Sequence, residues 1–202
     1  MSVKPILFNT EMVRAILDGR KTCTRRIVKG FIPNDAVWGY TAFTPKGYIS
    51  CRGTFADGYG EKFFKLPYQP GDILYVRETW SEWTDGYLYK AWNSPFPQAG
   101  QSSVMRWHPS IHMPKGAARI WLEVTNVRVE RLQEITPQGA WKEGARCSCL
   151  HPVPDCAGNK TTFVNIWNST IKKSNLDCYG WDADPWVWAI EFERCEKTGA
   201  EP

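Results

Sequence analysis

The sequence contains no long run of hydrophobic residues. Its longest apolar stretches, such as residues 186–190, are far shorter than the ~20 residues that a transmembrane helix needs. The opening MSVKPILFNTEMV places Asn and Glu where the apolar region of a signal peptide would lie. We therefore expect a cytoplasmic protein with no membrane partner.

The common motifs of nucleotide and hydrolase chemistry are also missing. The sequence has no P-loop, no G-x-G-x-x-G, no G-x-S-x-G and no H-E-x-x-H. A net charge of +4 is a mild basic excess, which permits an anionic partner but does not require one. These absences exclude the P-loop NTPases, the dinucleotide-binding enzymes, the α/β-hydrolases and the zincins.

Tryptophan and cysteine are abundant instead. The 11 tryptophans either fill the core and rims of a small β-barrel or stack on nucleobases. Seven cysteines, an odd number in a chain with no export signal, indicate free thiols or metal ligands rather than disulfides. Cys23 is then either a small packed side chain or a reactive thiol.

One cysteine-rich segment has residue types that bind zinc. Cys147, Cys149, His151 and Cys156 could act as ligands, but their spacing is not the usual C-x-x-C pair. We expect free thiols here, and no cofactor or tightly held metal, with zinc as the alternative. His108 and His112 flank Pro109 and are expected in a loop.

The pattern of apolar residues predicts a single α+β domain over residues 1–202. Expected strands cover residues 5–8, 22–28, 72–80, 86–91, 118–131 and 186–193, the fifth with a slip near residues 125–126; expected helices cover 12–17, 137–144 and 161–171. Strands from both ends of the chain around short helices favour an antiparallel or mixed barrel. Loop-like insertions are expected at about 29–69, 90–116 and 146–160.

Residues 19–26 concentrate positive charge directly after the first predicted helix. This segment, GRKTCTRR, contains four cations and two hydroxyl groups. Because a helix C-terminus favours cations, a solvated basic cap is one interpretation, and a functional pocket is the other.

The same segment resembles the signature of ASCH domains, G-x-K-x-x-x-x-R, through Gly19, Lys21 and Arg26. The stretches EMVRAILDGRKTCTRR, PGDILYVRETW and DPWVWAIEFE are similar to the larger ASCH proteins of phages and prophages. The resemblance implies a PUA-like pseudo-barrel with a pocket for a nucleoside or RNA.

Some small bacterial ASCH proteins are amidohydrolases that remove the acetyl group of N4-acetylcytidine. The resemblance implies Lys21, Thr24 and Glu143 as catalytic residues, with Glu130 and Glu134 as competing carboxylates; Arg26, Arg25, Glu78 and Trp80 are the expected substrate-binding residues. Lys21 would act as a base, its pKa lowered by burial and by neighbouring cations. Glu143 would move the proton, and Arg26 would stabilise the oxyanion or hold the carboxylates.

The catalytic assignment has a geometric requirement, and other functions remain open. In an ideal strand Lys21 and Thr24 would face opposite ways, so the catalytic assignment requires a bend at residues 19–22. The alternative functions are a PUA-like RNA-binding module, with or without ribonuclease activity, and a phage accessory protein that binds a nucleotide. The sequence leaves the oligomeric state open.

Overall fold

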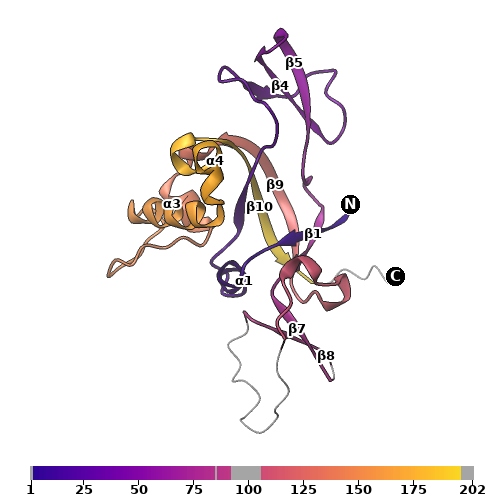
Figure 1. Ribbon diagram of the computed structural model, residues 1–202, viewed down its shortest axis with the longest axis vertical. Coiled ribbons are helices and arrows are strands. Elements are labelled where there is room, and N and C mark those ends of the chain that lie inside the picture. Colours follow the sequence, from indigo (N-terminus) through magenta and orange to yellow (C-terminus); the bar gives the residue numbers. More distant parts are fainter. Residues whose placement is uncertain (1, 85, 92–105, 197–202) are drawn as a thin grey trace.

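The computed structural model describes residues 2–84, 86–91 and 106–196 (Figure 1). The strands are β1 Val3–Leu7, β2 Cys23–Ile27, β3 Val37–Gly39, β4 Tyr48–Phe55, β5 Gly58–Lys65, β6 Ile73–Arg77, β7 Trp80–Trp83, β8 Gly86–Tyr89, β9 Trp121–Arg131 and β10 Trp186–Cys195. The α-helices are α1 Thr10–Leu17, α2 Pro137–Lys142, α3 Gly158–Thr170 and α4 Leu176–Tyr179, joined by the 3₁₀ turns Ser110–His112, Lys115–Ala117, Leu132–Glu134, Lys173–Asn175 and Trp181–Ala183. No helix in these ranges is long and apolar enough to span a bilayer.

A mixed five-stranded sheet forms the centre of the fold, in the order β1-β6-β9-β10-β2. β1 and β6 run parallel, and the other neighbours are antiparallel. The predicted α+β class, with mixed strands and short helices, is confirmed. β2 lies at one edge and pairs with β10, so the basic segment is held along the last strand of the chain.

β10 has hydrophobic residues on both faces because it lies between two clusters of core side chains. Trp188 and Ile190 pack in the larger cluster with Val13 and Ile16 of α1, whereas Val187 packs with the side chains of α2 and α3. The predicted slip in the long strand is confirmed: the register between β9 and β10 shifts around Thr125, which is left as a bulge.

The region 29–69 is not the loop that the sequence predicted. It contains a three-stranded antiparallel sheet, β3-β4-β5, which extends away from the main sheet in Figure 1. β4 places Ile49, Cys51, Gly53 and Phe55 on one buried face, and Gly53, which has no side chain, interrupts the apolar alternation in the sequence. A two-residue turn, Ala56-Asp57, connects β4 to β5.

The predicted strand 72–80 is divided in two. β6 ends at Arg77 and β7 begins at Trp80, so the hairpin partner β8 pairs with β7 and not with β6.

Of the predicted insertion 90–116, residues 92–105 lie outside the described residues, and its described part includes two 3₁₀ turns. The third insertion is shorter than predicted, because α3 begins at Gly158 rather than at residue 161.

Candidate functional site

The end of α1 shapes the start of the site. Asn9 caps the helix by accepting from the Met12 amide at 2.8 Å. At the other end Gly19 adopts a left-handed conformation with φ of 69°. The amides of Arg20 and Lys21 then both donate to the carbonyl of Ala15, at 2.7 and 2.9 Å. This tight turn is the bend that the catalytic assignment requires.

The end of α2 meets the chain just after this bend. Thr136 caps α2 through the Gly139 amide, as the sequence predicted. Lys21 and Glu143 form an isolated antiparallel bridge. Gly144, with φ of 85°, passes so close to α1 that an added Cβ would lie 3.0 Å from the Cβ of Ala15. Residues more than a hundred positions apart are thereby fixed side by side.

Lys21 and Glu143 form a buried ion pair at this bridge. The Lys21 Nζ atom lies 2.5 Å from Glu143 Oε2, and the two side chains are 0% and 6% exposed. The ammonium group also donates to the carbonyls of Cys23 at 2.8 Å and Glu143 at 3.0 Å. Burial lowers the pKa of Lys21 from its ordinary value of 10.5, and the charge of Arg26 lowers it further, while Glu143 opposes the shift.

Arg25 holds the other oxygen of this carboxylate. Its guanidinium lies 3.2 Å from Glu143 Oε1 and 2.5 Å from Glu130 Oε1. Glu130 also pairs with Arg128, at 2.9 Å. A buried network therefore runs from Lys21 through Glu143 and Arg25 to Glu130. Holding the carboxylates, one of two roles expected for Arg26, belongs to Arg25.

The geometry also separates the three candidate carboxylates. Glu143 contacts Lys21 directly, whereas Glu130 reaches the pair only through Arg25. Glu134 is exposed and accepts from the amide of Arg131, at 3.0 Å, far along the chain from the bridge. Among these three, the structure places Glu143 next to the lysine.

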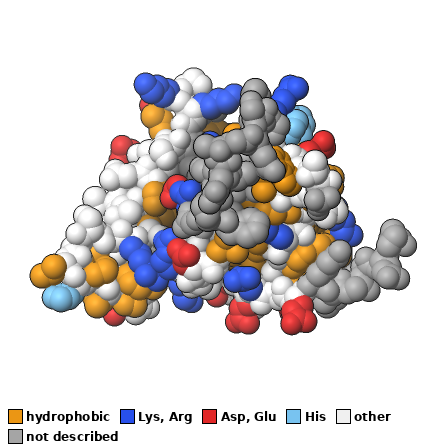
Figure 2. All heavy atoms as spheres, turned by 90° about the horizontal axis from the view of Figure 1, so that it is seen from below, with side chains coloured by type: hydrophobic (Ala, Val, Ile, Leu, Met, Phe, Trp, Pro, Cys, Tyr) orange, Lys and Arg blue, Asp and Glu red, His pale blue; other side chains and the backbone are white. Residues whose placement is uncertain are grey.

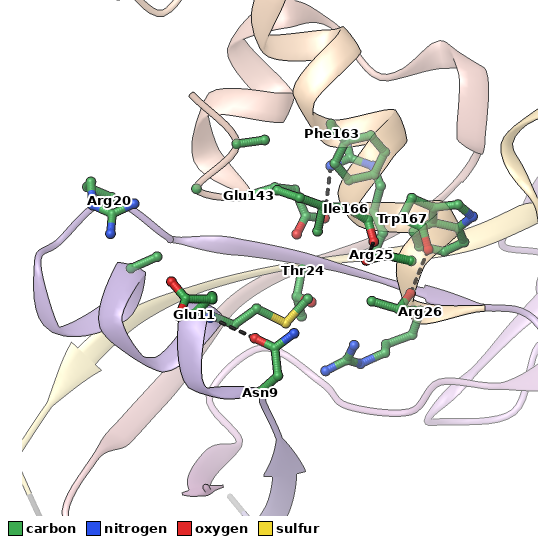
Figure 3. Close-up of a pocket in the computed structure, with 16 residues that line it drawn as sticks. Asn9, Glu11, Arg20, Thr24, Arg25, Arg26, Glu143, Phe163, Ile166 and Trp167 are labelled. Carbon is green, nitrogen blue, oxygen red and sulfur yellow. Dashed lines mark hydrogen bonds and ion pairs between the residues drawn. The ribbon is translucent and has the colours of Figure 1, made fainter. Parts of the chain in front are cut away.

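A cavity of about 360 Å³ opens beside this network (Figure 3). It is lined by Asn9, Glu11, Met12, Ala15, Arg20, Thr24, Arg25, Arg26, Glu143, Gly144, Ala145, Phe163, Ile166, Trp167, Ser169 and Thr170. β2 and the end of α2 supply a polar wall, and α3 supplies an apolar wall with two aromatic rings. This volume falls within the ~300–1,000 Å³ typical of small-molecule sites.

Lys21 is not among the residues that line the cavity. Thr24 and Glu143 face it, and Lys21 lies behind Glu143, in contact with the carboxylate. Arg26 also lines the cavity, with its guanidinium 5.3 Å from the Phe8 ring and bonded to the Leu7 carbonyl at 2.8 Å. A second hollow of about 370 Å³ adjoins at Arg26, Asn9 and Met12, which line both.

Glu78 and Trp80, expected to bind substrate, belong to a different part of the molecule. Glu78 is buried and pairs with Arg119 through both carboxylate oxygens, at 2.9 and 3.0 Å. Trp80 packs on His108, with ring centroids 5.0 Å apart. Neither residue is among those that line the cavity, although Thr79 between them lines the adjoining hollow.

Other predicted features have structural explanations. Cys23 is 1% exposed, and burial raises its pKa to about 12, so it is a packed thiol rather than a reactive one. His112 lies exposed in a 3₁₀ turn. Trp92 lies outside the described residues, and every other tryptophan is buried or half-buried. These rings therefore pack in the core and its rims, and Trp167 also lines the cavity.

The residues on the α3 side of the cavity were not predicted as part of the site. The sequence predicted a helix over residues 161–171 that contains Phe163, Ile166 and Trp167, and apolar residues of a helix also fit a core position. Either Asn9 or Thr10 was expected to cap α1; Asn9 does so, and it also lines the cavity. Only the packing of α3 against β2 assigns these residues to the site.

No family model matches this sequence, and no curated protein matches it. A crystal structure of an ASCH domain from Lactobacillus crispatus JV V101 is similar over 96% of this chain and 79% of that chain, with 12% sequence identity and a TM-score of 0.43. An identity and a TM-score this low identify neither a family nor a function.

Proposed function

We propose that this protein is an amidohydrolase that removes an acyl group from the exocyclic amine of a cytosine nucleoside, such as N4-acetylcytidine. The observation that carries the proposal is the buried Lys21–Glu143 pair, with Glu143 and Thr24 facing the same cavity. The sequence resemblance named these three residues together, and a small-molecule cavity beside them is the setting that such chemistry needs.

The pair supplies a proton acceptor and a proton donor in one place. Burial lowers the pKa of Lys21, so a proton passes readily between the amine and the carboxylate 2.5 Å away. In the proposed reaction the Lys21–Glu143 pair takes the proton of the Thr24 hydroxyl, or of a water bound to it, as that oxygen attacks the acyl carbon. The pair returns the proton to the departing amine. If Thr24 is the nucleophile, the acyl group is left as an ester on its oxygen, and a water molecule deprotonated by the same pair then hydrolyses that ester and releases the carboxylic acid. On either route, amide plus water gives carboxylic acid plus cytosine amine.

The other cavity residues fit supporting roles. Arg25 fixes the orientation of Glu143 by binding its second oxygen. Arg26 supplies a cation on the cavity wall for the oxyanion that develops on the acyl oxygen. Phe163 and Trp167 offer flat apolar surface against which a pyrimidine ring can lie.

A nucleoside suits this site better than an RNA strand. In the described part of the face shown in Figure 2, lysine and arginine side chains lie in small groups among hydrophobic and acidic ones. An RNA groove is typically a continuous basic surface with exposed rings for base stacking. The most exposed described rings, Phe31, Tyr40, Phe43 and Tyr59, are not among the residues that line the cavity. RNA binding, with or without cleavage, and nucleotide binding without turnover are the alternatives.

The test is an assay of the purified protein against free N4-acetylcytidine, followed by ultraviolet absorbance and by chromatography of the cytidine formed. We expect turnover by the wild-type protein and none by Thr24→Val. A wild-type protein that leaves the amide intact, yet binds RNA with a steep dependence on salt, would replace this proposal with the RNA-binding function.

A further inference from the structure

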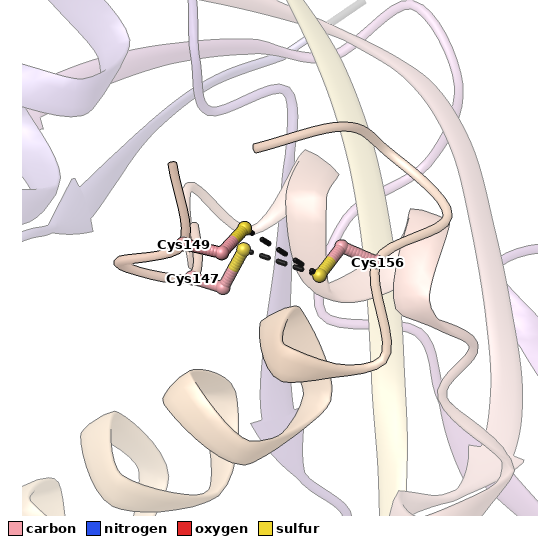
Figure 4. Close-up of side chains that lie close together, drawn as sticks. All are labelled: Cys147, Cys149 and Cys156. Carbon is pink, nitrogen blue, oxygen red and sulfur yellow. Dashed lines mark hydrogen bonds between the residues drawn. The ribbon is translucent and has the colours of Figure 1, made fainter. Parts of the chain in front are cut away.

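The loop between α2 and α3 brings three cysteines together away from the proposed catalytic pair (Figure 4). Their sulfur atoms all lie within 4.8 Å of one another. Cys147 Sγ lies 3.2 Å from Cys156 Sγ, and Cys149 Sγ lies 3.8 Å from it. A zinc ion with Zn–S bonds of ~2.3 Å in a tetrahedral arrangement separates its sulfurs by about 3.8 Å. The Cys149–Cys156 separation matches this value, the Cys147–Cys156 separation is shorter, and all three sulfurs lie close enough together to contact one ion.

The surrounding residues hold the thiols in this arrangement. Asn159 is completely buried, and its side-chain oxygen accepts from the amide of Cys147 at 2.9 Å. Its amide group donates to the carbonyls of Val153 and Pro154, at 2.9 and 3.0 Å. One side chain thereby fastens both arms of the loop, as residues around metal ligands commonly do.

The first residue of α3 is packed against the cluster. A Cβ at Gly158 would lie 2.8 Å from Cys147 Cβ and 3.6 Å from Cys156 Sγ, so only glycine fits without displacing the thiols. The helix starts here without a side-chain cap.

We propose that Cys147, Cys149 and Cys156 are the protein ligands of a Zn²⁺ site that fastens the loop to the start of α3. The sequence led us to expect free thiols because the spacing is irregular, but ligand geometry depends on the fold and not on spacing. His151 is exposed and is not part of the cluster of ligand atoms. The fourth position is left to solvent.

The site has a structural consequence for the cavity. α3 carries Phe163 and Trp167, which form the apolar wall. Among the described side chains, Asn159 hydrogen-bonds to both arms of the loop. A bound zinc would add three Zn–S bonds, joining Cys147 and Cys149 to Cys156 next to the start of α3. Zinc therefore stabilises the wall rather than taking part in the reaction.

The test uses the full chain without an affinity tag, purified with reductant throughout. We expect one equivalent of zinc by elemental analysis. Co²⁺ exchanged into the site should give the intense near-ultraviolet band of thiolate-to-cobalt charge transfer. Cys147→Ser and Cys156→Ser should each lose the zinc and the band. Cys178→Ser and Cys195→Ser, at free cysteines elsewhere, should keep both.

A second measurement guards against variants that fail to fold. Alkylation of the native wild-type protein, read by mass spectrometry, should spare Cys147, Cys149 and Cys156 until a chelator is added, while exposed Cys178 reacts from the start. Reduced protein that binds neither zinc nor cobalt would overturn the proposal. So would zinc that remains in the Cys147→Ser and Cys156→Ser variants, or alkylation of all three thiols regardless of chelator.

Discussion

Lys21 and Glu143 are separated by 122 positions in the sequence, yet the ammonium and carboxylate groups lie 2.5 Å apart in an almost water-free setting. An ion pair so deeply buried is no general source of stability, because two charges must leave water to form it. A role in catalysis explains a buried ion pair beside a cavity better than a role in stability does. Buried groups with shifted pKa values concentrate at functional sites.

Lys21→Ala should abolish deacylation. Removing a group that acts on the proton in the transition state lowers kcat by about 10²–10⁴-fold, whereas binding of an inert cytidine analogue should change little. Steady-state kinetics and a binding titration measure both. Lys142→Ala, at the exposed neighbour of Glu143, is the matched control and should keep full activity. Weaker RNA binding with a shallower salt slope in Lys21→Ala, and no deacylation by the wild type, would contradict the catalytic role.

The lowered pKa of Lys21 predicts a signed pH dependence of activity. If its neutral amine is needed, kcat/KM should rise with pH, with a midpoint below the ordinary lysine value of 10.5. A profile from neutral to alkaline pH measures this midpoint. A flat profile up to 10.5 would show that the amine does not titrate in catalysis.

The same shift predicts how stability changes with pH. Between the folded pKa of Lys21 and 10.5 the unfolded chain binds more protons, so the contribution of this group to the unfolding free energy grows as pH rises. It is lost as pH falls through the folded pKa. Urea unfolding of wild type and Lys21→Met across this window should show the difference.

Thr24→Val should stop catalysis without disturbing the fold. Valine has nearly the shape of threonine, and Thr24 is 1% exposed on β2, so the sheet should keep its packing while the hydroxyl is lost. Thr22→Val, at an exposed position two residues earlier, is the control. Turnover by Thr24→Val at the wild-type rate would remove Thr24 from the mechanism.

Much of this site was predictable because the information is local. The spacing of Gly19, Lys21 and Arg26 follows from one short motif, and the helix caps at Asn9 and Thr136 follow from side-chain hydrogen bonding to the nearest amides. The bulge near Thr125 was visible as a break in a two-residue period.

The remaining features depend on contacts between distant segments. Nothing in the sequence around Glu78 indicates that its carboxylate is buried against Arg119 and is not among the residues that line the cavity. Nor does the cysteine spacing tell that a loop folds three thiols together. β4 was missed because Gly53 stands at a buried position where the alternating pattern would have an apolar side chain.

Glu143→Gln should destabilise the protein as well as inactivate it. The change keeps the shape of the side chain but leaves Lys21 without its countercharge in a buried position, at a cost of about 3–5 kcal/mol. Urea unfolding at neutral pH measures the loss. Glu11→Gln breaks a pair in which the glutamate is 78% exposed and should cost less than ~1 kcal/mol. Equal losses in the two variants would contradict the buried pair.

Gly158→Ala should lower stability, against the usual preference of helices for alanine. The new methyl group would lie 2.8 Å from Cys147 Cβ, and overpacking of this kind costs about 1–3 kcal/mol. Thermal unfolding measures the effect. Gly116→Ala, where an added Cβ meets nothing within 4 Å, should be close to neutral. A stabilised Gly158→Ala would show that the loop yields easily.

The position of β2 at the edge of the sheet has a consequence for how the protein is made. Within the described sheet β2 pairs with β10 alone, and β10 is synthesised after every other described strand. Thr24 and Arg25 are therefore synthesised long before β10, the strand that positions them by pairing with β2. Such distant pairing slows folding. Truncated chains that end before β10 should lack activity, because β2 then has no partner strand to position Thr24 and Arg25.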